Sequence, residues 1–352
     1  MSTFYVATTG SDGAAGTSSG APWATITRAL DSAAGTKVVA GDTLLVEEGT
    51  YAENPDIDTA GTVTATTHIK GMAAGFVEPA AGVKPVTLSG QMRTTLGSGT
   101  AAYFRIENIA QSGYAGAGWN LGNLAYMTLI NCAALNNTGA SGDGFLLKHH
   151  SRLIGCIANG NARYGYNLVD PAAEDCQLLN CIAIGNTNHG FYTYTNGVNL
   201  DYCLAHANGA YGIYSGVSPP SGFAMSNCTC DGNANGVRAG GRGSSVINCI
   251  ISNNAGTGWV GYTSDALNCF ARNNLYYNNG TDRSNAPAGV GDITATDPLF
   301  TNLAGDDFTL QASSPAIAAG WPASIDIGAY QRLVTAGGGG LVRGLVAVGG
   351  NL

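Results

Sequence analysis

Apolar residues along this chain come in short runs of three to six, and each run is bounded by asparagine and glycine. Helices would instead place apolar residues at three-and-four spacing over longer segments. Short apolar runs between turn-forming residues are typical of strands. The pattern therefore predicts an all-β chain built of brief strands and frequent turns.

One phrase returns seven times between residues 131 and 274, as NCAALNN, GCIANGN, NCIAIGN, YCLAHAN, NCTCDGN, NCIISNN and NCFARNN. A cysteine heads each phrase, and an asparagine follows it five places later. The cysteines are Cys132, Cys156, Cys181, Cys203, Cys228, Cys249 and Cys269, and the asparagines are Asn137, Asn161, Asn186, Asn208, Asn233, Asn254 and Asn274. Successive cysteines are 24, 25, 22, 25, 21 and 20 residues apart, a period that indicates a solenoid.

A coil of about 23 residues with turns between brief strands predicts a parallel β-helix, because each strand can pair in register with its equivalent in the next coil. Equivalent residues then stack about 4.8 Å apart. We expect the cysteines to form a buried column and the asparagines to form an amide ladder at a turn. The chain from about residue 41 to residue 311 would hold about 12 such coils.

A second column follows the asparagines, in which a glycine at a corner precedes a large residue that points into the coil. Its members are Gly144-Phe145, Gly165-Tyr166, Gly190-Phe191, Gly212-Ile213, Gly236-Val237 and Gly258-Trp259. The same pattern starts one coil earlier, with Asn108-Ile109 and Gly118-Trp119. The repeat thus has a structural explanation that needs no ligand.

The regions outside the repeat suggest three parts: a cap over residues 1–40, the β-helix over residues 41–331 and a Gly-rich tail over residues 332–352. In the cap we expect a strand from Phe4 to Ala7 and a short helix from Pro22 to Ala33, which would cover the open edge of the first coil. The stretch from Asp297, DPLFTNLAGDDFTLQASSPAIAAG, is interpreted as the last coils, with turns at Pro298 and Pro315.

The small number of basic residues and the negative net charge restrict the kinds of molecule that the protein can bind. Charged residues are 11% of the chain, Lys and Arg number 15, and the net charge is -8. No basic run offers the counter-charge that a nucleic acid needs, and no apolar run reaches the length of a membrane span. The start, MSTFYVATTG, lacks the pattern of a secretory signal, so we expect a protein made in a cytosol, with free buried thiols and no cofactor or metal.

Three stretches resemble the right-handed parallel β-helix proteins of the pectate-lyase-like superfamily. They are the opening FYVATTGSDGAAGTSSGAPWATITRALDSA, the segment GDTLLVEEGTYAE and the closing DPLFTNLAGDDFTLQASSPAIAAG with DIGAYQ. Together with the repeat, the likeness extends from Phe4 to Gln331. It implies a single-stranded right-handed parallel β-helix, whereas function varies within this superfamily.

The resemblance also points to candidate catalytic residues. GDGFLLKHH, with Asp143, Lys148, His149 and His150, resembles the segment that carries the lysine base of family 9 polysaccharide lyases. Those enzymes hold calcium with an Asp cluster one coil later. This chain has Ala162-Arg163-Tyr164-Gly165-Tyr166-Asn167 at that place, so the calcium carboxylates are missing. We favour a solvated strand end for Lys148.

A hydrolase would need two carboxylates across a sugar-binding groove. Asp170, Glu174 and Asp175, with Asp201 one coil on, are candidates, and a solvated turn cluster is the alternative. Tyr192, Tyr194, Tyr211 and Tyr214 could stack on sugar rings, although strand alternation predicts that at least half of them face inward. Asp306 and Asp307 suit a turn, and His189 and His206 look incidental to any site.

Three functions compete: a secreted polysaccharide lyase or hydrolase, a phage tailspike, and a virion structural protein. The sequence favours the third, a capsid decoration or cement protein that forms a trimer. The Gly-rich tail is the observation behind this prediction, because its apolar residues, interleaved with glycine, cannot form a core alone. We expect Leu341, Val342, Arg343, Leu345 and Val346 to contact the major capsid protein or other virion subunits. Binding or cleavage of a polysaccharide is the alternative.

Overall fold

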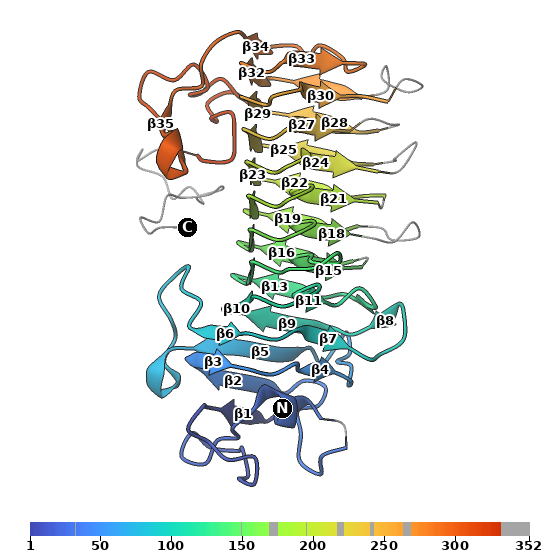
Figure 1. Ribbon diagram of the computed structural model, residues 1–352, viewed down its shortest axis with the longest axis vertical. Coiled ribbons are helices and arrows are strands. Elements are labelled where there is room, and N and C mark those ends of the chain that lie inside the picture. The colour runs from blue at the N-terminus through green and yellow to red at the C-terminus, as the bar shows by residue number, and fades with distance from the viewer. Residues whose placement is uncertain are drawn as a thin grey trace. The chain divides into compact units, whose positions relative to one another are not determined.

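The computed structural model describes residues 1–31, 33–148, 150–168, 175–194, 196–216, 222–239, 243–262 and 269–331. They divide into two compact units, which meet in the sequence at Cys176 and Gln177. Each unit is a stack of coils, and each coil contributes one strand to each of three parallel sheets, called here sheets A, B and C. Figure 1 labels the strands.

In the first unit, sheet A consists of β1 (Thr3–Val6), β2 (Thr43–Glu47), β5 (Thr67–Met72), β9 (Phe104–Glu107), β13 (Thr128–Ile130) and β16 (Arg152–Ile154). Sheet B consists of β3 (Gly49–Tyr51), β6 (Val86–Leu88), β10 (Ile109–Ser112), β14 (Ala133–Leu135) and β17 (Ile157–Asn159). Sheet C consists of β4 (Asp56–Ile57), β7 (Met92–Thr94), β11 (Trp119–Asn120), β15 (Phe145–Leu147) and β18 (Tyr166–Leu168). A side pair joins β8 (Thr100–Ala101) to β12 (Leu124–Ala125).

In the second unit, sheet A consists of β19 (Gln177–Leu179), β22 (Asn199–Asp201), β25 (Ala224–Ser226), β28 (Ser245–Ile247) and β31 (Phe270–Arg272). Sheet B consists of β20 (Ile182–Ile184), β23 (Leu204–His206), β26 (Thr229–Asp231), β29 (Ile250–Ser252), β32 (Leu275–Tyr277) and β34 (Ile293–Thr294). Sheet C consists of β21 (Phe191–Thr193), β24 (Tyr211–Ser215), β27 (Asn235–Arg238), β30 (Thr257–Val260) and β33 (Thr281–Ser284).

A strand and a helix form in the region predicted to be a cap, and the helix is shorter than expected. The helix α1 spans Ile26–Leu30, next to β1 (Figure 1). The Thr25 hydroxyl accepts the Arg28 N–H at 3.1 Å, and the Glu53 carboxylate accepts the N–H groups of Ile26 and Thr27 at 2.8 Å each. These bonds satisfy the free N–H groups of the first turn. Trp23, Ile26 and Leu30 are buried.

Parallel pairing in register confirms the repeat. In the first unit Ala133 pairs with Ile157, and in the second Leu204 pairs with Thr229. The cysteines that precede these strands are fully buried at Cys132, Cys156, Cys181, Cys203, Cys228 and Cys249. The large residues after the corner glycines also point inward and are fully buried, from Phe145 to Trp259. A Cβ on Gly190 would meet the Gly212 oxygen at 2.7 Å, which explains the glycine at this corner.

The seventh phrase is out of register with the other six, so the prediction for Cys269 and Asn274 is wrong. Ser245 pairs with Phe270, which places Asn274 above Cys249 in the cysteine column. The asparagine column continues at Asn279, whose Oδ1 accepts the Asn254 Nδ2–H at 2.9 Å. Cys269 is half-buried and lies before β31. The interval of 20 residues between the last two cysteines reflects this shift.

The described residues hold fewer coils than the predicted number of about 12. One reason is that early coils are longer than the repeat: His68 pairs with Arg105, 37 residues later. A second is that the residues after Asp297 add no coil. β35 (Phe300–Asn302) and β36 (Asp307–Leu310) pair antiparallel, and this hairpin lies beside sheet B of the second unit (Figure 1). The interpretation of this stretch as the last coils is therefore wrong.

Helix is scarce among the described residues, and none of their helices is long and apolar enough to cross a membrane. Two 3-10 turns, η1 (Ala74–Phe76) and η3 (Leu303–Gly305), complete the elements used below. Asp306 ends η3 in a left-handed conformation, and its N–H bonds to the Leu303 oxygen. This is the turn role that the sequence predicts for Asp306.

Candidate functional site

Asp143 is a structural residue. Its side chain is fully buried, and its carboxylate accepts bonds from Arg163 Nε at 2.6 Å and from Asn167 Nδ2 at 2.7 Å. Arg163 makes a second bond through its terminal nitrogen. A buried carboxylate held by a paired guanidinium has its charge and its lone pairs satisfied. Asp143 is thus occupied in fixing the turn before β15.

Lys148 lies at the other end of β15, about 16 Å from Asp143 along an extended chain. Its ammonium donates to the Ser98 hydroxyl, and its carbonyl accepts the Cys176 thiol at 3.3 Å. The structure therefore does not bring Lys148 and Asp143 together. Nearby, His150 lies at a turn rather than on a strand and stacks on Tyr126 at 4.7 Å, and Tyr126 stacks on Tyr103 at 4.9 Å.

The predicted carboxylates of the acidic loop lie only in part within the described residues. Asp170 and Glu174 lie outside the described residues, as does His149. Asp175 is exposed, with a left-handed backbone at φ 61°. Asp201 accepts bonds from the Ser226 hydroxyl at 2.8 Å and from Asn227 Nδ2 at 2.9 Å, so it braces the adjoining coil.

Among the described residues, no group of three or more His, Cys, Asp or Glu side chains is arranged to hold a metal ion. The predicted assembly residues Leu341, Val342, Arg343, Leu345 and Val346 lie outside the described part of the chain.

The chemistry that the structure does gather lies on the outer face of sheet C in the second unit. Phe191 and Thr193 point inward from β21, so Tyr192 points outward, and Tyr214 is its partner on β24. Tyr194 and Tyr211 lie at the ends of these strands, and His189 lies just before β21. We call Tyr192, Tyr194, Tyr211, Tyr214 and His189 the aromatic strip.

The rings of the aromatic strip are stacked. His189 lies 4.5 Å from Tyr214 and 5.6 Å from Tyr192, and Tyr192 lies 5.5 Å from Tyr214, with interplanar angles of 9° to 21°. Tyr194 extends the stack from Tyr192 at 6.4 Å. Parallel pairing in register produces this ladder, because equivalent side chains on neighbouring coils lie one strand spacing apart.

A guanidinium adjoins the strip. The Arg238 guanidinium carbon lies 5.0 Å from the ring centroids of both Tyr214 and Tyr262. Burial, and secondarily the charge of Arg238, lower the pKa of His189 to about 4. Its Nδ1 accepts the Tyr211 N–H at 3.1 Å, as a neutral imidazole can. The aromatic strip is therefore uncharged at His189, and the guanidinium of Arg238 beside it carries a positive charge.

The strip combines apolar ring surface with hydroxyl groups, the combination that suits a sugar polymer. Tyr194 is 41% exposed, and Tyr192, Tyr211 and Tyr214 are half-buried. The expectation that at least half of these tyrosines face inward is wrong, because Phe191 and Ile213 take the inward positions. The repeat held the missing signal: His189 and Tyr211 each follow a column cysteine by eight residues.

His206 is also more than incidental. Its Nδ1 lies 3.3 Å from the buried Asp231 carboxylate, and its Nε2 lies 3.4 Å from the Asp306 carboxylate in the hairpin. Burial acts to lower the pKa of His206, but the hydrogen bond and charge of Asp231 and the charge of Asp306 outweigh it, so the pKa is raised. This cluster joins the hairpin to sheet B.

Comparison with known proteins supports the fold. A family model described as "Right handed beta helix region" matches residues 83–219. A solved structure of the pectate lyase Pel9A is 19% identical, with a TM-score of 0.57 over 94% of this chain and 96% of that one. The tailspike gp49 of Acinetobacter baumannii bacteriophage Fri1, a capsular polysaccharide depolymerase, is 12% identical, with a TM-score of 0.47 over 72% of this chain and 51% of that one.

ORF18 of Geobacillus virus E2 is 13% identical, with a TM-score of 0.46 over 76% of this chain and 54% of that one. No curated protein sequence matches the chain. At 19% identity, the likeness to the pectate lyase Pel9A concerns the fold alone. The parallel sheets, the stacked columns and the family model together identify the chain as a right-handed parallel β-helix protein.

Proposed function

We propose that this protein binds a polysaccharide along the outer face of sheet C in its second unit. The observation that carries the proposal is the aromatic strip. The exposed ring of Tyr194 lies at one end of a stack of half-buried tyrosines, and Arg238 lies at the other end. Aromatic rings pack against the apolar faces of sugars, and tyrosine hydroxyls bond to sugar hydroxyls. A ladder that runs across successive coils suits an extended polymer better than a compact ligand.

Stability alone accounts for part of this stack. Tyr192 and Tyr214 cover each other and are covered by His189. Tyr194 is the informative residue, because an exposed ring at the end of a stack contributes little to folding. Arg238 adds a donor group that can bond to sugar hydroxyls or to a carboxylate.

The test is affinity electrophoresis against neutral and acidic polysaccharides, followed by calorimetry with the polymer that retards the protein. Tyr194→Ala should weaken binding about tenfold or more while the melting temperature stays unchanged. Tyr114→Ala is the matched control, since Tyr114 is a half-buried tyrosine on a turn of the first unit. If no polysaccharide retards the wild type, or if Tyr194→Ala binds as well, the proposal is wrong.

A virion structural role is the second candidate, and the tail sequence favours it. Residues 333–352 interleave apolar residues with glycine and carry Arg343 as their one charge, a composition that favours burial against other subunits. We propose that the chain decorates a capsid as a trimer that contacts the major capsid protein through this tail. The copy number in purified particles, measured by quantitative mass spectrometry against the major shell protein, tests it. Copies commensurate with the shell lattice would support decoration, and absence would refute it.

A further inference from the structure

A concave site lies in the second unit, between sheet B and the C-terminal hairpin. Its cavity volume is about 280 Å³. Asn253, Tyr277 and Asn278 line it from the β-helix, and Asp297, Leu299, Phe300, Leu303 and Gln311 line it from the hairpin region. We call it the hairpin pocket. It adjoins sheet B, whereas the aromatic strip adjoins sheet C, so the two sites are independent.

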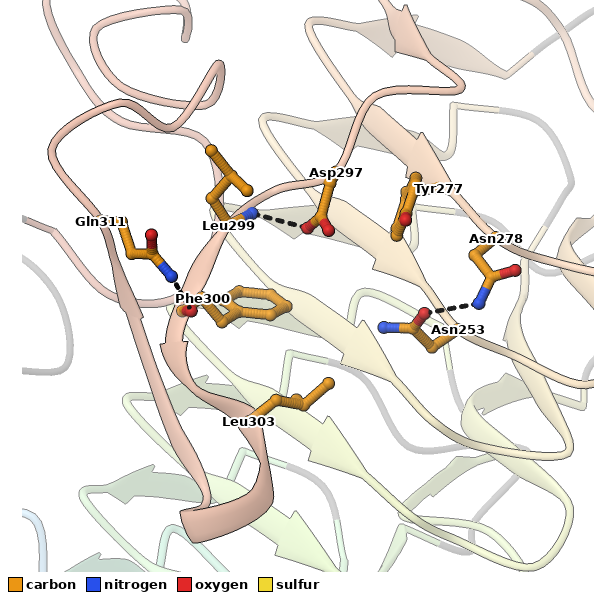
Figure 2. Close-up of a pocket in the computed structure, with 8 residues that line it drawn as sticks. All are labelled: Asn253, Tyr277, Asn278, Asp297, Leu299, Phe300, Leu303 and Gln311. Atoms are coloured by element: carbon orange, nitrogen blue, oxygen red, sulfur yellow. Dashed lines mark hydrogen bonds between the residues drawn. The ribbon is translucent and has the colours of Figure 1, made fainter.

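Part of the wall of the hairpin pocket is apolar and is formed by Leu299, Phe300 and Leu303. Figure 2 shows the Phe300 ring and the Leu303 side chain pointing from the hairpin toward Asn253 and Tyr277. Phe300 is fixed because it is 8% exposed and packs edge-on against Phe308 at 5.1 Å. The backbone of Tyr277 is fixed because β32 pairs with β29 in register. A flat ligand with an apolar face would thus meet a rigid ring at Phe300.

The rim of the pocket is polar, and its side chains are held in place. The Asn253 Oδ1 accepts the Asn278 Nδ2–H at 2.9 Å, and the Asp297 Oδ1 accepts the Leu299 N–H at 2.8 Å. The Gln311 Nε2 donates to the Phe300 oxygen at 2.8 Å. These three bonds, drawn in Figure 2, orient the side chains of the rim. Asn278, Asp297 and Gln311 each keep a second side-chain polar atom that takes no part in these bonds.

Four polar atoms of this rim are left for a ligand. Asn278 Oδ1, Asp297 Oδ2, Gln311 Oε1 and the Tyr277 hydroxyl have no hydrogen bond to any residue that the structure describes. Three of the four are acceptors and one is a hydroxyl. This set matches a ligand that presents several hydroxyl donors.

We propose that the hairpin pocket binds one neutral sugar ring, either free or at the end of a glycan chain. The lining contains a carboxylate and no cationic side chain, which disfavours uronates and phosphates. The volume lies just below the usual range for ligand sites, which suits a single ring. A hexose has about a dozen heavy atoms, so we expect a dissociation constant of about 1 mM.

The experiment titrates methyl glycosides of glucose, galactose, mannose and N-acetylglucosamine into the full chain, followed by saturation-transfer NMR. At least one glycoside should bind to the wild type. Leu303→Trp should fill the pocket and weaken that binding about tenfold or more. Asp297→Asn keeps the oxygen that caps Leu299 but replaces the free acceptor with a donor, and should weaken binding several-fold.

Tyr114→Ala, a change in the first unit, should leave monosaccharide binding unchanged. A wild type that a polysaccharide retards but that binds no glycoside would mean failure of this pocket alone, which separates it from failure of the aromatic strip. Circular dichroism confirms that each variant is folded. The proposal is overturned if none of the four glycosides binds the wild type at about 20 mM. It is equally overturned if folded Leu303→Trp and Asp297→Asn both bind as the wild type does.

Discussion

At the scale of single residues, the amide ladder shows how one side chain can serve three neighbouring coils. Asn208 Nδ2 donates to Asn233 Oδ1 at 2.9 Å and to the Ala183 oxygen at 3.1 Å, and its own Oδ1 accepts the Asn186 Nδ2–H at 2.9 Å. All of these groups are buried. The ladder therefore satisfies polar groups that water cannot reach.

Asn208→Ala should destabilise the protein by about 2–3 kcal/mol, because it leaves donors and acceptors of two neighbouring coils buried and unpaired. Urea unfolding followed by circular dichroism measures the loss. Asn199→Ala, an exposed strand position in the same unit, should change stability by less than about 0.5 kcal/mol. Equal effects of the two changes would refute the role assigned to the ladder.

The cysteines should differ in reactivity. Eight are buried, and Cys269 is half-buried. Burial raises the pKa of Cys132 and Cys203, which lowers the fraction of reactive thiolate. Iodoacetamide applied to the native protein, followed by mass spectrometry, should modify Cys269 before any other cysteine. A Cys269 that reacts as slowly as the buried column cysteines would contradict the shifted register of the seventh phrase.

The cysteine and asparagine columns could be predicted from the sequence, because each asparagine follows its cysteine by five residues even where the coil length changes. It failed at Cys269 and Asn274 because a repeated phrase fixes spacing within a phrase, whereas register depends on the pairing of strands. Asn274 fits the interior because its side chain bonds to the Cys249 N–H at 3.0 Å and to the Val246 oxygen at 3.0 Å. An amide side chain whose hydrogen bonds are made in this way can occupy a buried position that a cysteine takes in the other coils.

At the scale of elements, the C-terminal hairpin is held to sheet B by a titratable contact. His206 bridges Asp231, which is 1% exposed, and Asp306, which is 42% exposed. The other groups facing this imidazole are the Phe308 ring at 4.9 Å and Gly232. Asp307, the next residue after Asp306, adds negative charge to the same turn. Protonated His206 therefore favours docking of the hairpin.

The pH dependence follows from the raised pKa of His206. A group whose pKa is higher in the docked state stabilises that state fully below the ordinary value near 6.5, and this stability is lost as the pH rises through the raised value. Hydrogen exchange of residues 300–310, corrected for its intrinsic pH dependence, should show weaker protection at pH 8.5 than at pH 6. The expected loss is about 0.5–1 kcal/mol.

Two variants separate this contact from general effects. His206→Gln should remove the pH dependence of exchange in the hairpin. His189→Gln should preserve it, because the pKa of His189 is lowered to about 4 and its imidazole stays neutral between pH 6 and 8.5. Hairpin protection that varies with pH in His206→Gln as in the wild type would refute the contact's role.

The strands were more predictable than the hairpin or the aromatic strip. The repeated phrase and its period identify strands such as β14 and β17, because each depends on local sequence and on one repeat. The hairpin has the same short apolar runs, and only its long-range contacts reveal that it leaves the stack: its Asp306 carboxylate lies 3.4 Å from His206 Nε2, 100 residues earlier in the chain. The sequence indicated the four tyrosines of the aromatic strip but not their common outward face, because that face depends on how two separate coils pair.

At the scale of the whole molecule, the C-terminal tail is the predicted contact between subunits, and removing it tests that prediction. We predict that a chain ending at Leu333 keeps the circular dichroism spectrum and melting temperature of the full chain, because parallel pairing and the buried columns lie within residues 1–331. Analytical ultracentrifugation should show a trimer for the full chain and a monomer for the shortened one, if the apolar tail residues form the contact.

A double variant sharpens the comparison, since deletion also removes backbone. Leu341→Asp with Val346→Asp keeps the length and flexibility of the tail but places charge where burial is expected, at a cost of several kcal/mol per buried unpaired charge. It should dissociate the trimer as the deletion does, whereas Arg343→Lys should not. A trimer that persists after deletion would place the contact on the β-helix itself, and a full chain that is monomeric at all concentrations would refute the trimer.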